Sequence, residues 1–270
     1  MKRQDDKKDF KRRRRRRFAG LVAFLLAVLS AVVVLCLAIF FKIQTITVVG
    51  THRYQESDII YVSGILPEQN ILAIDPAASA QHVLESFPYM EAVRVVRRLP
   101  TTVEIQVTES VPALVVINSP DSYTLLSTSG RMIEQGSGVA REELPLVVGA
   151  DLSQFPPGSY GDETVEETLT TLRYLLDAIQ ETGMEHISYI DVGDRLSTAL
   201  LYDNRALVVL GSEKDLPGKL RRAKELLDHQ LGDRFVGRVD LSVPDRGYTE
   251  AADVDELMHE DYRAGYFKYE

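Results

Sequence analysis

One long apolar run stands near the start of the chain, ahead of two regions in which short apolar and polar positions alternate. The run covers residues 18–41, and none of its twenty-four residues is charged. At about 1.5 Å per helical residue it would span about 36 Å, which exceeds the roughly 30 Å of a hydrocarbon core. The pattern predicts a transmembrane helix over residues 18–41.

The seventeen residues before this run are strongly basic. Residues 1–17 hold eleven Lys or Arg against three Asp, about +8, so the rest of the chain carries about −17 of the total of −9. Basic residues mark the cytoplasmic end of a span, so we expect this tail in the cytoplasm, near anionic lipid, and residues 42–270 on the other side. A signal peptide would have a shorter apolar run and a cleavage site, so an uncleaved anchor is favoured.

Residues 42–110 predict a small α+β domain. Alternation at Ile46 and Val48 indicates a strand, and two helices follow, the first ending at Gly64 and the second capped by Asp75. Residues 93–107 alternate on both sides of a turn, as in a hairpin. The element order is therefore β-α-α-β-β, and two helices can cover only one face of a three-stranded sheet.

Residues 111–245 predict a second, β-rich domain of mixed α/β type. Asp162 and Gly183 bound one expected helix, and a last helix is expected over residues 216–231. Asp203 and Asn204 mark a tight hairpin. Residues 246–270 are expected to hold a short edge segment at 247–249 and an acidic, aromatic tail. The expected strands are 114–117, 123–126, 146–148, 187–192, 196–202, 206–210 and 238–243.

The first domain contains a series of short motifs in a fixed order. They are Ile46-x-Val48-x-Gly50, Ser63-Gly64-Ile65, Asn70-Ile71-Leu72-x-Ile74-Asp75, Pro88-Tyr89 and Arg97-x-Leu99-Pro100-x-Thr102-x-x-Ile105-x-Val107-x-Glu109-x-x-Pro112. Together they resemble the POTRA domain of the FtsQ/DivIB cell-division family. Looser landmarks of that family's second domain follow, including Gly211 and Val239-Asp240-Leu241, so the resemblance covers residues 1 to about 245.

The resemblance implies a non-enzymatic protein that crosses the cell membrane once and acts as a scaffold at the division septum. Its expected partners are FtsB/DivIC-like and FtsL-like division proteins, and the expected mechanism is pairing of a partner strand with an open sheet edge. The candidate partner-binding residues are Val239, Leu241, Tyr248 and Thr249. Tyr248 is the preferred anchor, although packing beneath the tail is an equal alternative for it.

Catalytic and cofactor motifs are absent from the sequence. There is no P-loop, nucleotide-binding glycine motif or serine-nucleophile motif, so no catalytic residue, cofactor, small-molecule substrate or nucleic-acid partner is expected. His259-Glu260 lacks the second histidine of a zinc motif, because Arg263 stands there, and no metal is expected. Asp191 and Asp194 flank a glycine as in an ordinary turn. The lone Cys36 lies in the span and can form no disulfide within the chain.

Two alternatives remain open. A membrane-anchored hydrolase of the cell envelope would need a nucleophile or metal constellation that the sequence does not display. A transport or insertion factor with a POTRA domain would normally carry a translocating β-barrel, for which the chain has no room.

Overall fold

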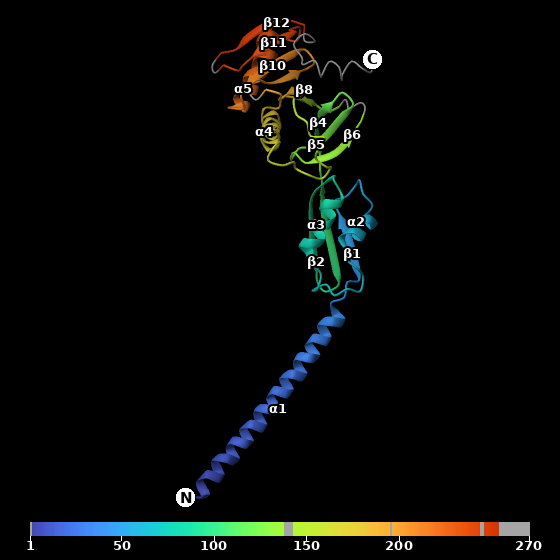
Figure 1. The fold of residues 1–270 in the computed structure, drawn as a ribbon, viewed down its shortest axis with the longest axis vertical. Coiled ribbons are helices and arrows are strands. Elements are labelled where there is room, and N and C mark those ends of the chain that lie inside the picture. The colour runs from blue at the N-terminus through green and yellow to red at the C-terminus, as the bar shows by residue number, and fades with distance from the viewer. Residues whose placement is uncertain (1, 138–142, 195, 244–245, 254–270) are drawn as a thin grey trace. The chain divides into compact units, whose positions relative to one another are not determined.

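The computed structural model describes residues 2–137, 143–194, 196–243 and 246–253 (Figure 1). The expectations for the tail beyond Asp253, including His259-Glu260, lie outside these residues. The chain divides into two compact units, which are described separately. The first comprises Met1–Val83 and Val93–Val107, and the second Leu84–Ala92 and Thr108–Glu270.

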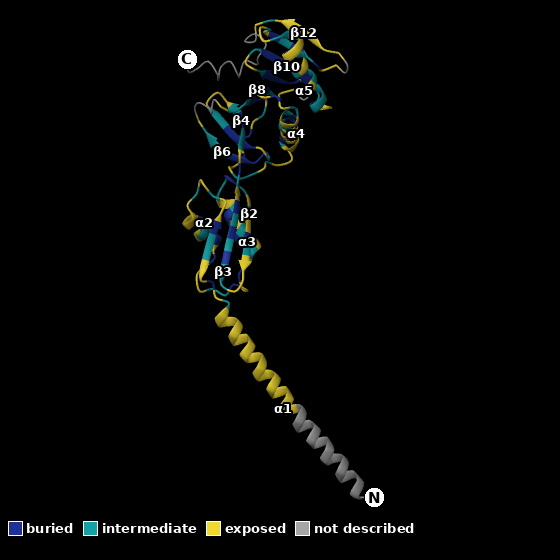
Figure 2. Ribbon diagram, turned by 180° about the vertical axis from the view of Figure 1, so that it is seen from behind, coloured by how far each residue is buried: buried dark blue, intermediate teal, exposed yellow. Residues whose placement is uncertain are grey.

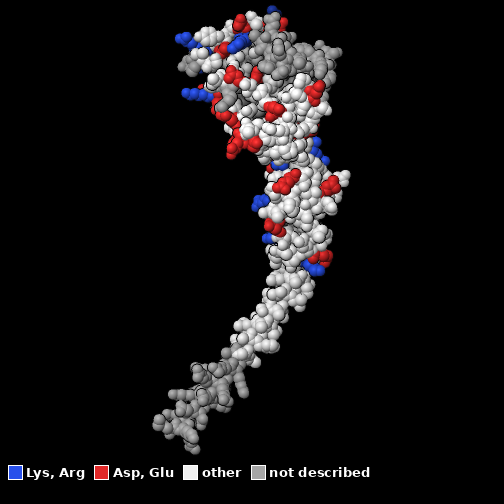
Figure 3. All heavy atoms as spheres, in the orientation of Figure 1, with Lys and Arg blue, Asp and Glu red and all other residues white. Residues whose placement is uncertain are grey.

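The first unit begins with one long helix, α1 (Lys2–Phe40). Within it, Gly20–Phe40 has a mean hydropathy of 3.1 and is long and apolar enough to cross a membrane. Figure 2 shows this part of α1 as exposed along its length, and Figure 3 shows it without charged side chains. An apolar surface this large is unfavourable in water, so the helix is consistent with membrane anchoring.

The predicted first domain, residues 42–110, has the β-α-α-β-β order that the sequence predicts. Its three strands lie in the order β1-β3-β2, and β1 pairs in parallel with β3. Ile46 and Val48 lie opposite Val103 and Ile105, so the alternating apolar residues share one face. The elements are β1 (Thr45–Val49), α2 (Glu56–Ser63), α3 (Pro76–Ser86), β2 (Met90–Arg98) and β3 (Thr102–Glu109).

Local signals set the helix ends in this domain. The Asp75 carboxylate accepts hydrogen bonds from the backbone N–H groups of Ala77 and Ala78, at 3.0 and 3.2 Å, and so caps α3 as predicted. Gly64 ends α2 in the left-handed conformation, also as predicted. At the start of α2, Gln55 makes no capping hydrogen bond through its side chain.

The second unit is built on one nine-stranded mixed sheet in the order β12-β11-β10-β9-β8-β7-β4-β5-β6. The predicted hairpin at Asp203-Asn204 is confirmed, with φ of 51° and 50° and antiparallel β9 and β10 around it. The strands are β4 (Pro112–Ser119), β5 (Ser122–Ser127), β6 (Met132–Gly136), β7 (Leu146–Val148), β8 (Ile187–Asp191), β9 (Thr198–Tyr202), β10 (Ala206–Gly211), β11 (Gly237–Asp240) and β12 (Tyr248–Ala251).

Two helices, α4 (Glu166–Thr182) and α5 (Leu216–Glu225), lie on the same side of this sheet (Figures 1 and 2). Their apolar stripes pack on alternate strand residues to form the main core. In β10, Val208 belongs to this core, whereas its neighbours Leu207 and Val209 belong to a cluster on the opposite face.

Two helix boundaries of the second unit are corrected, and one strand is added. Helix α4 begins at Glu166 and not at Asp162, because the Asp162 side chain bonds Thr164 and forms a turn ahead of the helix. The expected last helix changes at Leu226 into a π-helical segment, η1 (Leu226–Leu231). Strand β6 was not predicted, since its sequence MIEQG shows little alternation.

Arg131 is the largest fully buried side chain of the second unit, with 2 % of its surface exposed. Its guanidinium donates hydrogen bonds to the carbonyl oxygens of Pro88 at 3.1 Å and Leu84 at 2.8 Å, and it stacks over the Tyr160 ring. A buried charge is tolerated only when such partners replace water. Arg131 therefore holds the segment 84–92 within this unit.

We expect Arg131→Met to lower the free energy of unfolding by about 3 kcal/mol, because two partly buried carbonyl oxygens would lose a charged donor that is itself buried. Arg173→Met is the matched control: Arg173 is exposed, so its loss should change stability by no more than about 0.5 kcal/mol. Chemical denaturation of the full chain measures both. Equal effects of the two variants would contradict this role for Arg131.

Candidate functional site

The four candidate binding residues occupy two kinds of position. Val239 on β11 and Leu241 just after it are 0 % and 1 % exposed and belong to the main core. Tyr248 and Thr249 lie on β12 and are exposed, Tyr248 by 55 %. Only Tyr248 and Thr249 can offer side chains to a partner, while Val239 and Leu241 fix the strand behind them.

Strand β12, and not β11, ends the sheet in the part of the chain that is described. β11 pairs in parallel with β10 and antiparallel with β12. The short strand expected at 247–249, beside the strand expected at 238–243, forms this edge, and β11 lies inside the sheet. Every second residue of an edge strand points its N–H and C=O groups away from the sheet, where another strand can pair with them.

The register places the side chains of β12 on two faces. Thr249 lies opposite Val239 and so shares its face with the main core and the helices. Tyr248 lies opposite Asp240, and Glu250 opposite Arg238, on the other face. A strand added beside β12 would meet a tyrosine and charged groups on one face and a threonine on the other.

Asp240 organises the charged face next to Tyr248. It pairs with Arg238 at 2.9 Å, and its carboxylate also accepts hydrogen bonds from the Ser242 N–H and hydroxyl. Burial alone would raise the pKa of Asp240, but the hydrogen bonds from Ser242 and Arg238 outweigh it, so the pKa lies below its ordinary value. The carboxylate is ionised at neutral pH and its charge is balanced by Arg238.

Arg205 holds the segment that leads into β11. The sequence analysis did not predict this role. Its guanidinium donates hydrogen bonds to the carbonyl oxygens of Gly232 and Phe235, at 3.1 and 3.2 Å, and to Asp203 at 3.0 Å. The Gly237 N–H donates to the Arg205 carbonyl at 3.0 Å. One residue of the β9–β10 hairpin thus sets where β11 begins, a long-range contact that no sequence spacing reveals.

Gly237 allows β12 to pair closely with β11. It has φ of +151°, and an added Cβ would lie 2.1 Å from the Glu250 carbonyl oxygen. A side chain at this position is therefore incompatible with the observed pairing of β11 and β12. A glycine at the start of an expected strand was the only sequence signal for this constraint.

Lys219 stabilises the end of β10 that lies beside β11. Its ammonium donates to the carbonyl oxygens of Leu210 and Ser212, both at 2.7 Å, and its desolvation lowers its pKa. Gly211 between them has φ of +69°, and a Cβ there would lie 2.7 Å from the Ser242 Cβ. The Leu241 N–H bonds the Val209 carbonyl at 2.8 Å, which extends the pairing past β11.

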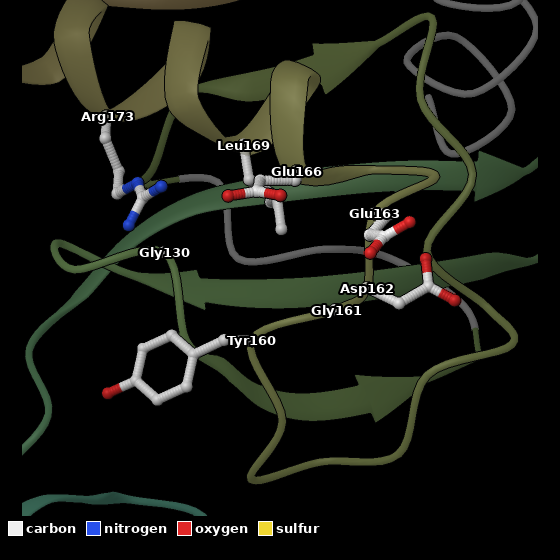
Figure 4. A pocket seen from close by; sticks show the side chains of 8 residues that line it. All are labelled: Gly130, Tyr160, Gly161, Asp162, Glu163, Glu166, Leu169 and Arg173. Carbon is white, nitrogen blue, oxygen red and sulfur yellow. The ribbon is translucent and has the colours of Figure 1, made fainter.

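A pocket of about 300 Å³ lies elsewhere in the second unit, at the start of α4 (Figure 4). Figure 4 shows Glu166 and Arg173 projecting from the helix, with Asp162 and Glu163 on the preceding loop. Hydrogen bonds from Thr164 lower the pKa of Asp162, the opposite of what a general acid needs. The other lining residues are Gly130, Tyr160, Gly161 and Leu169.

The other candidates for chemistry have structural explanations. The Asp191 and Asp194 carboxylates accept hydrogen bonds from the Gly193 and Leu196 N–H groups, at 2.8 and 2.9 Å, so each forms a turn with its own backbone. Among the described residues, no group of three His, Cys, Asp or Glu side chains is placed to hold a metal ion.

Comparison with protein families gives two matches. Residues 41–110 match the model for the POTRA domain, FtsQ-type, and residues 115–242 match the model for the C-terminal part of cell division protein FtsQ/DivIB. A search of curated proteins found no match. The second matched segment contains β11 and stops before β12.

We expect Gly237→Ala to detach β12, because its Cβ would clash with the Glu250 carbonyl. Hydrogen exchange of the Glu250 N–H, which faces β11, should quicken by about tenfold or more, equivalent to about 1.4 kcal/mol. Gly64→Ala is the control, since Gly64 also has positive φ, +69°, but nothing lies within 4 Å of its added Cβ and it lies in the first unit. Equal exchange in the two variants would show that the β11–β12 pairing does not depend on Gly237.

We expect Asp240→Asn to reduce the free energy of unfolding by about 1.5 kcal/mol at neutral pH. Because the pKa of Asp240 is lower in the folded chain than its ordinary 3.8, its ionised form stabilises the fold above that value. This contribution is lost as the pH falls through the folded pKa. The difference in the free energy of unfolding between the parent and the variant, measured from denaturation curves, should therefore shrink as the pH falls from 7 through the folded pKa of Asp240. A deficit that persists at acid pH would argue for packing instead.

Proposed function

Since the chain belongs to the FtsQ/DivIB family of cell-division proteins, we propose that it is a non-enzymatic scaffold of the division complex, anchored in the cell membrane by α1. The family domains place the protein in cell division and imply interactions with other proteins. The single observation that carries the proposal further is the position of β12: among the described residues no strand pairs with its outer side, and it exposes Tyr248 beside a fixed β11.

The proposed partners are an FtsB/DivIC-like and an FtsL-like division protein. A segment of one partner would pair with β12 as a tenth strand, so that main-chain hydrogen bonds supply affinity and side chains on alternate faces supply specificity. An apolar or aromatic side chain of the partner would complement Tyr248. A basic side chain is favoured near Glu250, since the Asp240 charge is already paired with Arg238.

Tyr248 is the proposed anchor of this contact. A tyrosine offers a large apolar face with little conformational entropy to lose, and its hydroxyl can keep a polar partner. With only four residues, β12 offers few main-chain hydrogen bonds, so affinity would depend strongly on this side chain. Thr249 would contact the partner on the face of the sheet that carries the helices. Val239 and Leu241 would not touch the partner, but their burial in the core holds β11 in place behind β12.

The proposed topology follows from charge and length. Residues 1–17 would lie in the cytoplasm, residues 18–41 in the membrane, and residues 42–110 and 111–245 would form the POTRA and β domains outside it. Residues 246–270 would contribute the edge strand and a tail. The protein would then present β12 on the outer side of the membrane at the division septum.

Binding by the full-length chain tests the proposal. The chain would be reconstituted in lipid nanodiscs, and its dissociation constants for the exported segments of the FtsB/DivIC-like and FtsL-like proteins of the same organism would be measured. We expect Tyr248→Ala to weaken binding by about tenfold or more, as for an interface hot spot. Thr249→Pro should weaken it too, because proline removes a backbone donor and interferes with strand pairing.

Tyr174→Ala is the matched control, because Tyr174 is a partly exposed tyrosine on α4, away from β12. It should leave the dissociation constant unchanged. Binding that is equally tight in all variants would move the interface away from β12, and the absence of binding by the parent chain would refute the proposed partners.

A further inference from the structure

The end of α1 is tied to a loop of the first unit by hydrogen bonds. The Asn70 amide donates to the Leu37 carbonyl at 3.2 Å, and the Ile71 N–H donates to the Phe41 carbonyl at 2.7 Å. The Asn70 side-chain oxygen in turn accepts the Leu72 N–H at 2.9 Å. Asn70 therefore connects the loop to a carbonyl inside the apolar helix, about 6 Å before Phe41 at 1.5 Å per residue.

A second loop reaches the same place. The N–H groups of Gln44 and Thr45, at the start of β1, donate to the Thr101 carbonyl at 2.8 and 3.3 Å. Thr101 belongs to the turn between β2 and β3. Residues 66–72 and 99–101 thus both lie around the point where the chain leaves α1.

These two loops expose three leucines. Leu66, Leu72 and Leu99 are 65 %, 45 % and 58 % exposed. They are not displaced core residues, because Ile65, Ile71 and Ile74 of the same segment are buried in the domain. We name Leu66, Leu72 and Leu99 the leucine collar.

Charged groups near the collar are paired with one another. Lys42 contacts Glu68 at 3.1 Å, and Arg98, next to Leu99, contacts Glu104 at 3.2 Å. Paired charges are cheaper to bring near lipid than isolated ones. The surface beside α1 thus combines exposed leucines with neutralised ion pairs, a composition suited to the boundary between headgroups and acyl chains.

We propose that the leucine collar is a lipid-contact surface that rests in the outer interface of the bilayer crossed by α1. This rests on the proposed membrane anchor. The occupant is lipid and not a partner protein, because the loops that carry the collar are bonded to the end of the apolar helix α1 and to the start of β1, and Asn70 holds its loop at the level of the final turn of that helix. Interfacial groups settle about 5–10 Å into this boundary, a depth that side chains beside the final turn can reach. The collar would keep the base of the first domain on the membrane and restrict its swing about α1.

The test measures depth in the full-length chain reconstituted in liposomes that contain lipid and no other protein. Since Cys36 is the only cysteine, Cys36→Ser provides a background for single labels at Leu66→Cys, Leu72→Cys and Leu99→Cys. Each would carry an environment-sensitive fluorophore, quenched by lipids that bear a nitroxide near the headgroup. Val49→Cys is the matched control: Val49 is an exposed apolar residue of the same unit, 46 % exposed, at the other end of β1.

We expect at least about twofold stronger quenching at each collar position than at Val49, whose label lies about 13 Å further along β1 at 3.3 Å per residue. Quenching no stronger than at Val49 would overturn the lipid contact while leaving the anchor intact. Extraction of the chain from membranes by alkaline carbonate would refute the anchor, and the collar proposal with it. Because no other protein is present, quenching at the collar can come only from lipid.

Discussion

The pairing of β12 with β11 is the contact on which the candidate interface depends. β12 is short and exposed on both faces, so its position follows from main-chain hydrogen bonds and from what holds β11. β11 is held by its buried apolar residues, by the Arg205 contacts at its start and by the bond from Leu241 to Val209 at its end. A partner strand would meet an edge whose geometry is set in advance, which reduces the ordering cost of binding.

Stability and recognition are separated in this unit. The core lies between the large sheet and the helices α4 and α5, and it contains the side chains that determine where the strands lie. The edge contributes little to that core, so Tyr248 is free to remain exposed. An exposed edge is also a risk of aggregation, and its short length and the charged Glu250 limit that risk.

The first domain links a membrane helix to a sheet through its loops. Hydrogen bonds from Asn70, Ile71 and Gln44 satisfy backbone groups at the helix end and at the start of β1, where the chain changes from one regular structure to another. The same loops then carry leucines outward and isoleucines inward. A single segment in this way serves both the domain core and the surface next to α1.

Most of the element order was accessible from the sequence, because apolar periodicity, Asp75, Gly64 and the Asp203-Asn204 turn act locally. The POTRA motifs, in their order, were sufficient to indicate the family. The start of α4 was missed because Asp162 bonds Thr164 and not the helix. The π-helical end of α5 and the strand β6 depend on packing against the sheet, which periodicity does not report.

The sequence by itself determined the apolar helix, the two-domain order and the family, since these follow from composition, spacing and short motifs. Only the tertiary structure decided which late strand forms the edge, and therefore that Val239 and Leu241 are buried while Tyr248 and Thr249 are accessible. The physical reason is that strand neighbours are chosen by long-range hydrogen bonds and core packing. The parallel pairing of β11 with β10 and the close approach allowed by Gly237 join residues whose relation the local sequence does not encode.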